Sequence, residues 1–196
     1  FRKDFNLPDN GFIFTSFNAN RKISEKEFDI WMRLLIQIKG SVLWLIKSND
    51  WSIKNLYKEA EKRNVDSNRL IFANKLPIDK HLARHSLGDL GLDTFNYNGH
   101  TTTSDAIWAG LPILTKVGTS FSARVSASLL TSLGIPELIT YNEKEYEEKA
   151  LYLARDEGKL IELKSKIAKL RKSSTLFNSE QYTKILESKF IELVNS

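Results

Sequence analysis

The stretch Ser41-Val42-Leu43-Trp44-Leu45-Ile46 decides the fold, because it is a continuous apolar run of strand length. Apolar and polar residues do not alternate in it, which is typical of a strand covered on both faces of a parallel sheet. Other short apolar runs are predicted strands at 11–17, 69–72, 87–92, 111–115 and 137–140. Helical patterns separate these strands, as in βαβ units. The sequence therefore predicts an α/β fold, a Rossmann-like doubly wound parallel sheet with helices on both faces.

The predicted helices follow from start and stop signals as well as from periodicity. Ser24 and Glu27 form a capping box that opens a helix ended by Gly40. Further helices are predicted at 52–64, 79–85, 101–109 and 122–133, and the chain reads as helical in two or three pieces from 143 to 196. No internal repeat is present, so we expect a single domain, 1–196, whose C-terminal helical part covers about 143–196.

Composition narrows the classes of protein. The chain has 196 residues, with 41% hydrophobic and 27% charged, as in an ordinary soluble domain. It has no cysteine, no signal-peptide pattern and no apolar run near the roughly 20 residues that cross a bilayer, so we expect a cytoplasmic protein without a membrane partner. The net charge of +5 is spread along the chain, which does not favour nucleic acid as a partner.

Ligands of an open parallel sheet bind outside the carboxyl ends of its strands, so the loops after strands are the candidate sites. In the first loop, 17–23, Lys22 can present an ammonium group to a phosphate; the alternative is an ordinary solvated loop. In the segment 77–85, His81 or Arg84 can stack on a flat base. His81 and His85 are also four residues apart, like zinc ligands on a helix, but no HExxH motif occurs and a plain surface helix stays open.

The third loop, 92–105, carries the sharpest signal. Four consecutive hydroxyl residues, 101–104, open a helix after Gly99, and such a helix start offers unpaired amides and a positive dipole end to a phosphate. Asp105 lies in the first turns of that helix, where a carboxylate suits the hydroxyls of a ribose. The alternative is that Thr101 caps the helix and the other hydroxyls face solvent.

These residues resemble a known family. His100-Thr101-Thr102 with Asp105, followed by the stretch 107–112, is similar to the nucleotide-binding signature of protein O-linked N-acetylglucosamine transferases. The resemblance continues in order along nearly the whole chain, through 17–23, 41–45, 69–72, 77–81, 92–94, 123–125, 176–178 and 181–183. The related Spindly fucosyltransferases usually lack a histidine before the threonines, so His100 favours a UDP-sugar over GDP-fucose.

The resemblance implies the C-terminal lobe of a GT-B glycosyltransferase, which transfers N-acetylglucosamine from UDP-GlcNAc to Ser or Thr hydroxyls of proteins with inversion. It implies a metal-independent reaction, and it places the N-terminal lobe, the tetratricopeptide repeats and the general base outside this chain. Lys22 matches the lysine that contacts the diphosphate and supports departure of UDP. The other matches are the phosphate donors Thr101 and Thr102, His100 of the same cradle, the ribose binder Asp105, the uracil-stacking His81 and the base-proximal Arg84.

Two positions depart from the family pattern. Ala19 stands where vertebrate members have glutamine, and Ile78 stands where a lysine would reach the ribose. These departures leave alternatives open: a non-catalytic nucleotide-binding or protein-interaction domain, or a transferase that uses another donor such as UDP-glucose or GDP-fucose.

Overall fold

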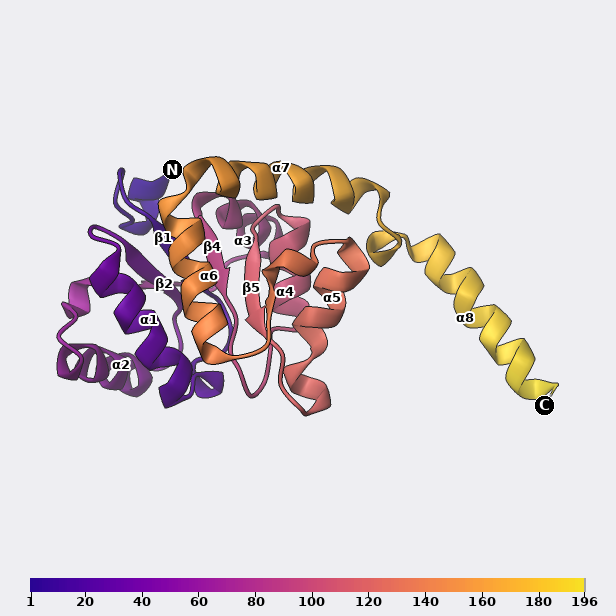
Figure 1. Cartoon of the computed structure of the whole chain (residues 1–196), viewed down its shortest axis with the longest axis horizontal. Coiled ribbons are helices and arrows are strands. Elements are labelled where there is room, and N and C mark those ends of the chain that lie inside the picture. Colours follow the sequence, from indigo (N-terminus) through magenta and orange to yellow (C-terminus); the bar gives the residue numbers. More distant parts are fainter. Residues whose placement is uncertain (196) are drawn as a thin grey trace.

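A computed structural model describes residues 1–195. Its centre is a parallel sheet in the order β3-β2-β1-β4-β5-β6 (Figure 1). The strands are β1 (Ile13–Ser16), β2 (Val42–Ile46), β3 (Leu70–Ala73), β4 (Leu90–Leu92), β5 (Ile113–Lys116) and β6 (Ile139–Thr140). The chain runs outward from β1 to β3 and then returns to place β4 beside β1, so the strand order reverses between β1 and β4. The predicted doubly wound α/β fold is confirmed, and this reversal is where such sheets bind ligands.

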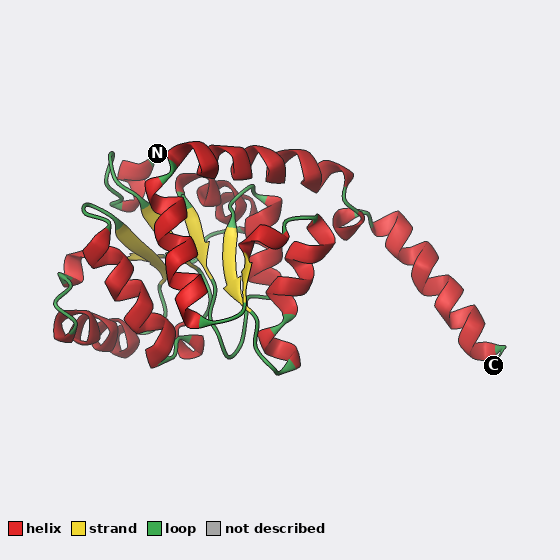
Figure 2. Cartoon of the chain, viewed as in Figure 1, coloured by secondary structure: helices red, strands yellow, loops and turns green. Residues whose placement is uncertain are grey.

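Helices cover both faces of the sheet (Figure 2). They are α1 (Glu25–Gln37), α2 (Asp50–Lys62), α3 (Ile78–Arg84), α4 (Thr101–Trp108), α5 (Val125–Leu133), α6 (Glu143–Arg155), α7 (Glu157–Ser173) and α8 (Ser179–Val194). Phe14, Leu43 and Leu45 belong to the large core that includes the buried sides of α1 and α6. The alternate residues Val42 and Trp44 pack into a second core on the opposite face. Burial on both faces explains why β2 is apolar throughout.

Some element boundaries differ from the sequence prediction. The predicted strand 87–92 is shorter, because a 3₁₀ turn, His85–Leu87, comes directly before Gly88 and the strand starts at Leu90. A Cβ atom on Gly88 would lie 2.6 Å from Cγ2 of Thr15, so the backbone approaches β1 closely there. The strand predicted at 111–115 likewise begins only after Pro112.

The C-terminal helices differ in how they pack. The helices α6 and α7 bury apolar residues against the core, among them Tyr146, Leu153, Leu163 and Ile167. In contrast, α8 has no buried residue and extends away from the rest of the chain (Figure 1). The predicted helical stretch ends at Ser196, which lies outside the described residues. None of the helices described here is both long and apolar enough to cross a membrane.

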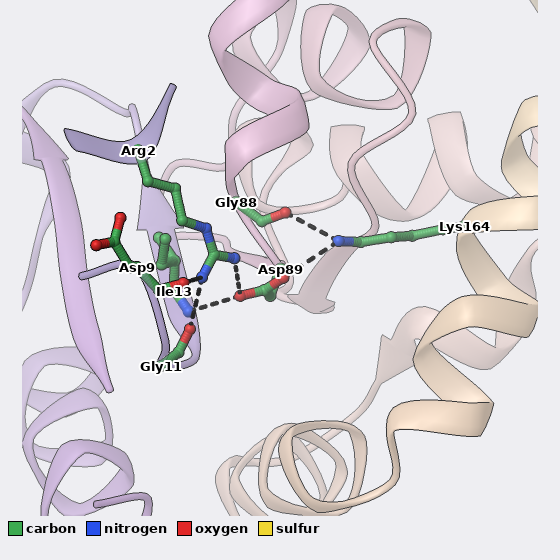
Figure 3. Close-up of polar contacts among 7 residues, drawn as sticks. All are labelled: Arg2, Asp9, Gly11, Ile13, Gly88, Asp89 and Lys164. Carbon is green, nitrogen blue, oxygen red and sulfur yellow. Dashed lines mark hydrogen bonds and ion pairs between the residues drawn. The ribbon is translucent and has the colours of Figure 1, made fainter. Parts of the chain in front are cut away.

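A cluster around Asp89 ties the N-terminal segment to the sheet (Figure 3). The Asp89 carboxylate accepts hydrogen bonds from Arg2 at 3.1 Å, from the amide of Ile13 at 2.8 Å and from Lys164 at 3.3 Å. Arg2 also donates to the carbonyl of Gly11 at 2.9 Å. Because Ile13 opens β1 and Asp89 directly precedes β4, this cluster fixes the two strands that border the point of reversal, at the edge opposite their carboxyl ends.

Candidate functional site

The loops after β1 and β4 meet at the carboxyl edge of the sheet. The buried Asn18, which follows β1, donates its side-chain amide to Asp93 and to the hydroxyl of Thr94, both at 3.0 Å. Asp93 and Thr94 follow β4 directly. This contact between loops more than 70 residues apart joins the first and third of the loops that the sequence indicated.

Asp93 organises the third loop. Its carboxylate accepts hydrogen bonds from the amides of Gly99 at 2.7 Å and Thr94 at 2.9 Å, and from the hydroxyl of Thr115 at 2.7 Å. Burial raises the pKa of Asp93, while these donors favour its charged form. The loop also requires a glycine, because a Cβ atom on Gly99 would lie 2.4 Å from Oγ1 of Thr103 and 3.1 Å from its amide nitrogen.

The first turn of α4 is not capped by the chain itself. The N-cap residue is His100, whose side chain makes no capping hydrogen bond, so the alternative of Thr101 as the cap is wrong. Within residues 1–195 no acceptor pairs with the amides of Thr101, Thr102 or Thr103. The hydroxyls behave differently: Thr101 is exposed, whereas Thr103 is buried and bonds to Ser126 at 2.8 Å. The row of four hydroxyls therefore does not face a ligand as a whole.

Lys22 lies beside this helix start. It ends a 3₁₀ turn, η2 (Asn20–Lys22), and its ammonium donates to the carbonyl of Asn98 at 3.0 Å. The same ammonium lies 4.1 Å from the centre of the Tyr97 ring. No carboxylate in the described part of the chain lies within ion-pair distance of it. Burial lowers the pKa of Lys22, the charge of Asp93 opposes that shift, and Arg21 adds to it.

An open cavity of about 580 Å³ brings four of the predicted site residues together. It is lined by Lys22, His100, Thr101 and Thr102, with Arg21, Ile23, Ser24, Asn96 and Tyr97 completing its wall. The cationic side chains of Lys22 and Arg21 and the uncapped start of α4 therefore line one cavity, which is an arrangement suited to an anion.

The other predicted residues lie apart from that cavity. His81, Arg84 and Asp105 do not line it, although they come from α3 and α4, which are in contact. Burial and the charge of Arg84 lower the pKa of His81, and the nearby Asp105 opposes this. Arg84 is only 2% exposed: it donates to the carbonyl of Asn74 at 2.6 Å and lies 2.5 Å from Nδ1 of His81. The structure therefore places Arg84 behind His81, as its support.

The metal interpretation finds no support in this geometry. The rings of His81 and His85 are 4.9 Å apart, but His85 is buried. Nowhere in residues 1–195 do three His, Asp or Glu side chains form a group that could hold a metal ion.

Sequence reasoning missed two contributors. Tyr97 carries no sequence signal of its own, yet its ring contacts both Lys22 and His100. Asp93 lies within the third loop, and the structure shows that its carboxylate holds that loop together. An acidic residue directly after an apolar run and before a glycine-containing loop is a signal that could have indicated Asp93; nothing local to Tyr97 indicated its contacts.

Comparison with known proteins places this geometry in a family. Residues 1–186 match the family described as Glycosyl transferase family 41. A UDP-N-acetylglucosamine–peptide N-acetylglucosaminyltransferase of Caenorhabditis elegans is 35% identical over 95% of this chain, which spans 16% of that protein. A probable enzyme of the same description from Arabidopsis thaliana is 32% identical over 99% of this chain, which spans 20% of that protein.

A solved structure agrees with these sequence matches. The O-GlcNAc transferase of Thermobaculum terrenum superimposes with a TM-score of 0.87 and 30% identity, covering 93% of this chain and 36% of that one. Family match, collinear identity and shared architecture thus extend over nearly the whole chain, and from them it follows that the chain belongs to glycosyl transferase family 41.

Proposed function

We propose that this chain is the nucleotide-sugar-binding lobe of an inverting glycosyltransferase that moves N-acetylglucosamine from UDP-GlcNAc to Ser or Thr hydroxyls of proteins. The observation that carries the proposal is the uncapped first turn of α4, which opens onto the cavity that Lys22 also lines. A diphosphate at this place would receive the amides of Thr101 and Thr102, the positive end of the helix and one ammonium group. The name of the C. elegans relative supports the same donor and a peptide acceptor, and that of the T. terrenum relative supports the same sugar.

The chemistry proposed for Lys22 follows from charge. Transfer of the sugar breaks its bond to the diphosphate, so negative charge grows on the departing UDP. A cation that is already in position before the reaction starts stabilises that charge, and the site does not have to rearrange during the reaction. Lys22 is suited to this role because carbonyl and ring contacts hold it, while among residues 1–195 no carboxylate lies within ion-pair distance of its ammonium. Lys22 is therefore the catalytic residue that we assign to this lobe, and the general base would come from elsewhere in the whole protein.

The nucleoside would lie on the other side of the α4 start. We propose that His81 stacks on the uracil, that Arg84 holds His81 in place and that Asp105 binds the ribose hydroxyls. His81 is half-buried and Asp105 is partly exposed, so both can contact a ligand, and the influence of Asp105 on the pKa of His81 supports their proximity. His100 would complete the phosphate cradle from the N-cap of α4.

The chain spans about a fifth or less of its curated relatives, so the whole protein's partners are also proposals. We propose that an N-terminal lobe, preceded by tetratricopeptide repeats, completes the enzyme. The apolar face of α8 supports this, because Tyr182, Ile185 and Phe190 are all more than half exposed on a helix that has no buried residue. This face would pack against the other lobe.

Calorimetric titration with UDP and with uridine tests the proposal. We expect UDP to bind and to bind more tightly than uridine, and we expect no sugar transfer by this chain alone. Lys22→Ala removes a charge-assisted contact of about 1.5–3 kcal/mol, which corresponds to roughly a ten- to hundredfold weaker affinity for UDP with little change for uridine. Lys39→Ala is the matched control, because Lys39 is an exposed lysine in the loop that precedes β2, at the opposite edge of the sheet. Equal affinity for UDP and uridine would refute the diphosphate site.

The donor is tested by competition against bound UDP. UDP-GlcNAc, UDP-glucose and GDP-fucose are compared with the same chain, and we expect UDP-GlcNAc to displace UDP and GDP-fucose to fail. Ile78 bears on this comparison, since it is 63% exposed at the start of α3 where the resemblance implies a ribose-binding lysine. Ile78→Lys should therefore tighten UDP binding. Displacement by GDP-fucose alone would move the assignment to the other donor class.

A further inference from the structure

Lys22 is held by two neutral groups. Its ammonium donates to the carbonyl of Asn98 at 3.0 Å and lies 4.1 Å from the centre of the Tyr97 ring. A carbonyl and the face of an aromatic ring attract a cation without cancelling its charge. A carboxylate would hold the lysine more strongly, but it would also compete with any incoming anion. The observed pair of contacts therefore keeps the positive charge in place and available.

The Tyr97 ring is itself fixed to the loop. The backbone carbonyl of Tyr97 accepts a hydrogen bond from the hydroxyl of Thr94 at 2.6 Å, and the carbonyl of Thr94 accepts one from the side chain of Asn98 at 2.7 Å. The ring stacks on His100, with centroids 4.8 Å apart and planes inclined by 19°. Tyr97 is thus braced on one side by the N-cap residue of α4, although 45% of its surface is exposed in the cavity wall.

The ring, not the hydroxyl, makes these contacts. No hydrogen bond of the Tyr97 hydroxyl occurs in the part of the chain that is described here. Free lysine side chains lose up to about 2 kcal/mol of rotamer entropy when they are ordered. A ring that orders Lys22 before the ligand arrives removes part of that cost from binding.

We propose that Tyr97 is a positioning residue of the diphosphate site: its ring, braced by His100, holds the Lys22 ammonium beside the first turn of α4. This inference rests on the proposed function and adds to it a residue that acts through Lys22. Its consequence is specific to the phosphates. Loss of the ring should weaken the binding of UDP and leave that of uridine unchanged.

Calorimetry on the purified chain tests the inference with Tyr97→Leu, Tyr97→Phe and UDP or uridine as ligand. We expect Tyr97→Leu to weaken UDP about two- to fivefold, the range given by an exposed cation–π contact, without affecting uridine. Tyr97→Phe should bind UDP with the affinity of the parent chain, because it keeps the ring. Tyr152→Leu is the matched control, since Tyr152 on α6 is similarly exposed, at 49%, and does not line the cavity.

A double-mutant cycle separates positioning from a structural role. In the Lys22→Ala background, Tyr97→Leu should have no further effect on UDP, because the group that it positions is gone. An equal effect in both backgrounds would overturn the inference. So would a Tyr97→Leu variant that binds UDP as tightly as, or more tightly than, the parent chain. If the parent chain binds UDP no better than uridine, the proposed function fails and the inference fails with it.

A second measurement covers the case in which Tyr97→Leu does not fold. With ¹³C-labelled lysine, ring currents should shift the Lys22 methylene signals upfield in the parent chain and in Tyr97→Phe. Signals at ordinary lysine positions in both proteins would show that the ring does not hold Lys22, which refutes the proposal without any ligand.

Discussion

Protonation of His85 should make the stability of this chain depend steeply on pH. His85 is 1% exposed, and its two ring nitrogens have no hydrogen-bond partner within the described residues. Its ring lies 5.2 Å from that of Phe17 and 4.9 Å from that of His81. Burial, helped by the charges of His81 and Arg84, lowers the pKa of His85 from 6.5 to about 3. The folded chain therefore keeps His85 neutral where an unfolded chain protonates it.

The direction and size of the effect follow from this shift. Because the pKa is lower in the folded chain, the stability is fully present above the unfolded pKa of 6.5 and is lost as pH falls toward about 3. Each pH unit in that window costs about 1.4 kcal/mol, so lowering the pH from neutral to about 5 removes about 2 kcal/mol and the full window removes about 5 kcal/mol. His85→Leu removes the titrating group and breaks no hydrogen bond, so it should cost less than about 1.5 kcal/mol at neutral pH.

Urea unfolding followed by tryptophan fluorescence measures both quantities. The parent chain and His85→Leu are compared at neutral pH and at about pH 5, and the measured value is the difference between their losses of unfolding free energy. We expect the parent to lose about 2 kcal/mol more than the variant. Other acid-sensitive groups act equally in both proteins and cancel. Identical losses would refute the reasoning, because they would mean that His85 can take up a proton in the folded chain.

Two further substitutions test the packing around the site, and a third tests an ion pair between α1 and α6. Gly99→Ala should destabilise the chain by about 1–3 kcal/mol in urea unfolding, because its Cβ atom would lie 2.4 Å from Oγ1 of the buried Thr103; a neutral effect would contradict the close approach. Asp93→Ala should cost more than about 2 kcal/mol by the same assay, since it leaves several buried donors without an acceptor. Arg33→Ala removes a two-pronged ion pair with Glu147 and should cost less than about 1 kcal/mol, a loss that shrinks at high salt because Arg33 is half exposed; a loss independent of salt would point to packing instead.

The order of elements could be predicted because their signals are local. The apolar run 41–46 became β2, and the predicted capping residues Ser24 and Glu27 open α1, where the Glu27 carboxylate accepts a hydrogen bond from the Ser24 amide at 2.9 Å. The ends of the strands could not be predicted in the same way. The start of β4 depends on how closely Gly88 approaches β1, and this is a contact between segments that are far apart in the sequence. The packing of α8 likewise differs from that of α6 and α7, although all three have helical sequence patterns.

The residues of the candidate site also divide into those that the sequence indicates and those that only the structure reveals. Lys22, His100, Thr101 and Thr102 could be indicated from sequence, because each lies in a loop or helix start that follows a strand, and they do line one cavity. Sequence alone could not separate the four hydroxyls at the start of α4, whereas the structure turns Thr103 inward against Ser126.

By itself the sequence determined the α/β class, the alternation of strands and helices, and which loops carry polar chemistry, since hydrophobic periodicity and capping act over a few neighbouring residues. Only the tertiary structure decided that Lys22 meets Tyr97 and Asn98, that Asp93 holds the loop and that Arg84 lies behind His81. The physical reason is the return of the chain from β3 to β4, which brings the carboxyl ends of β1 and β4 together across more than 70 intervening residues.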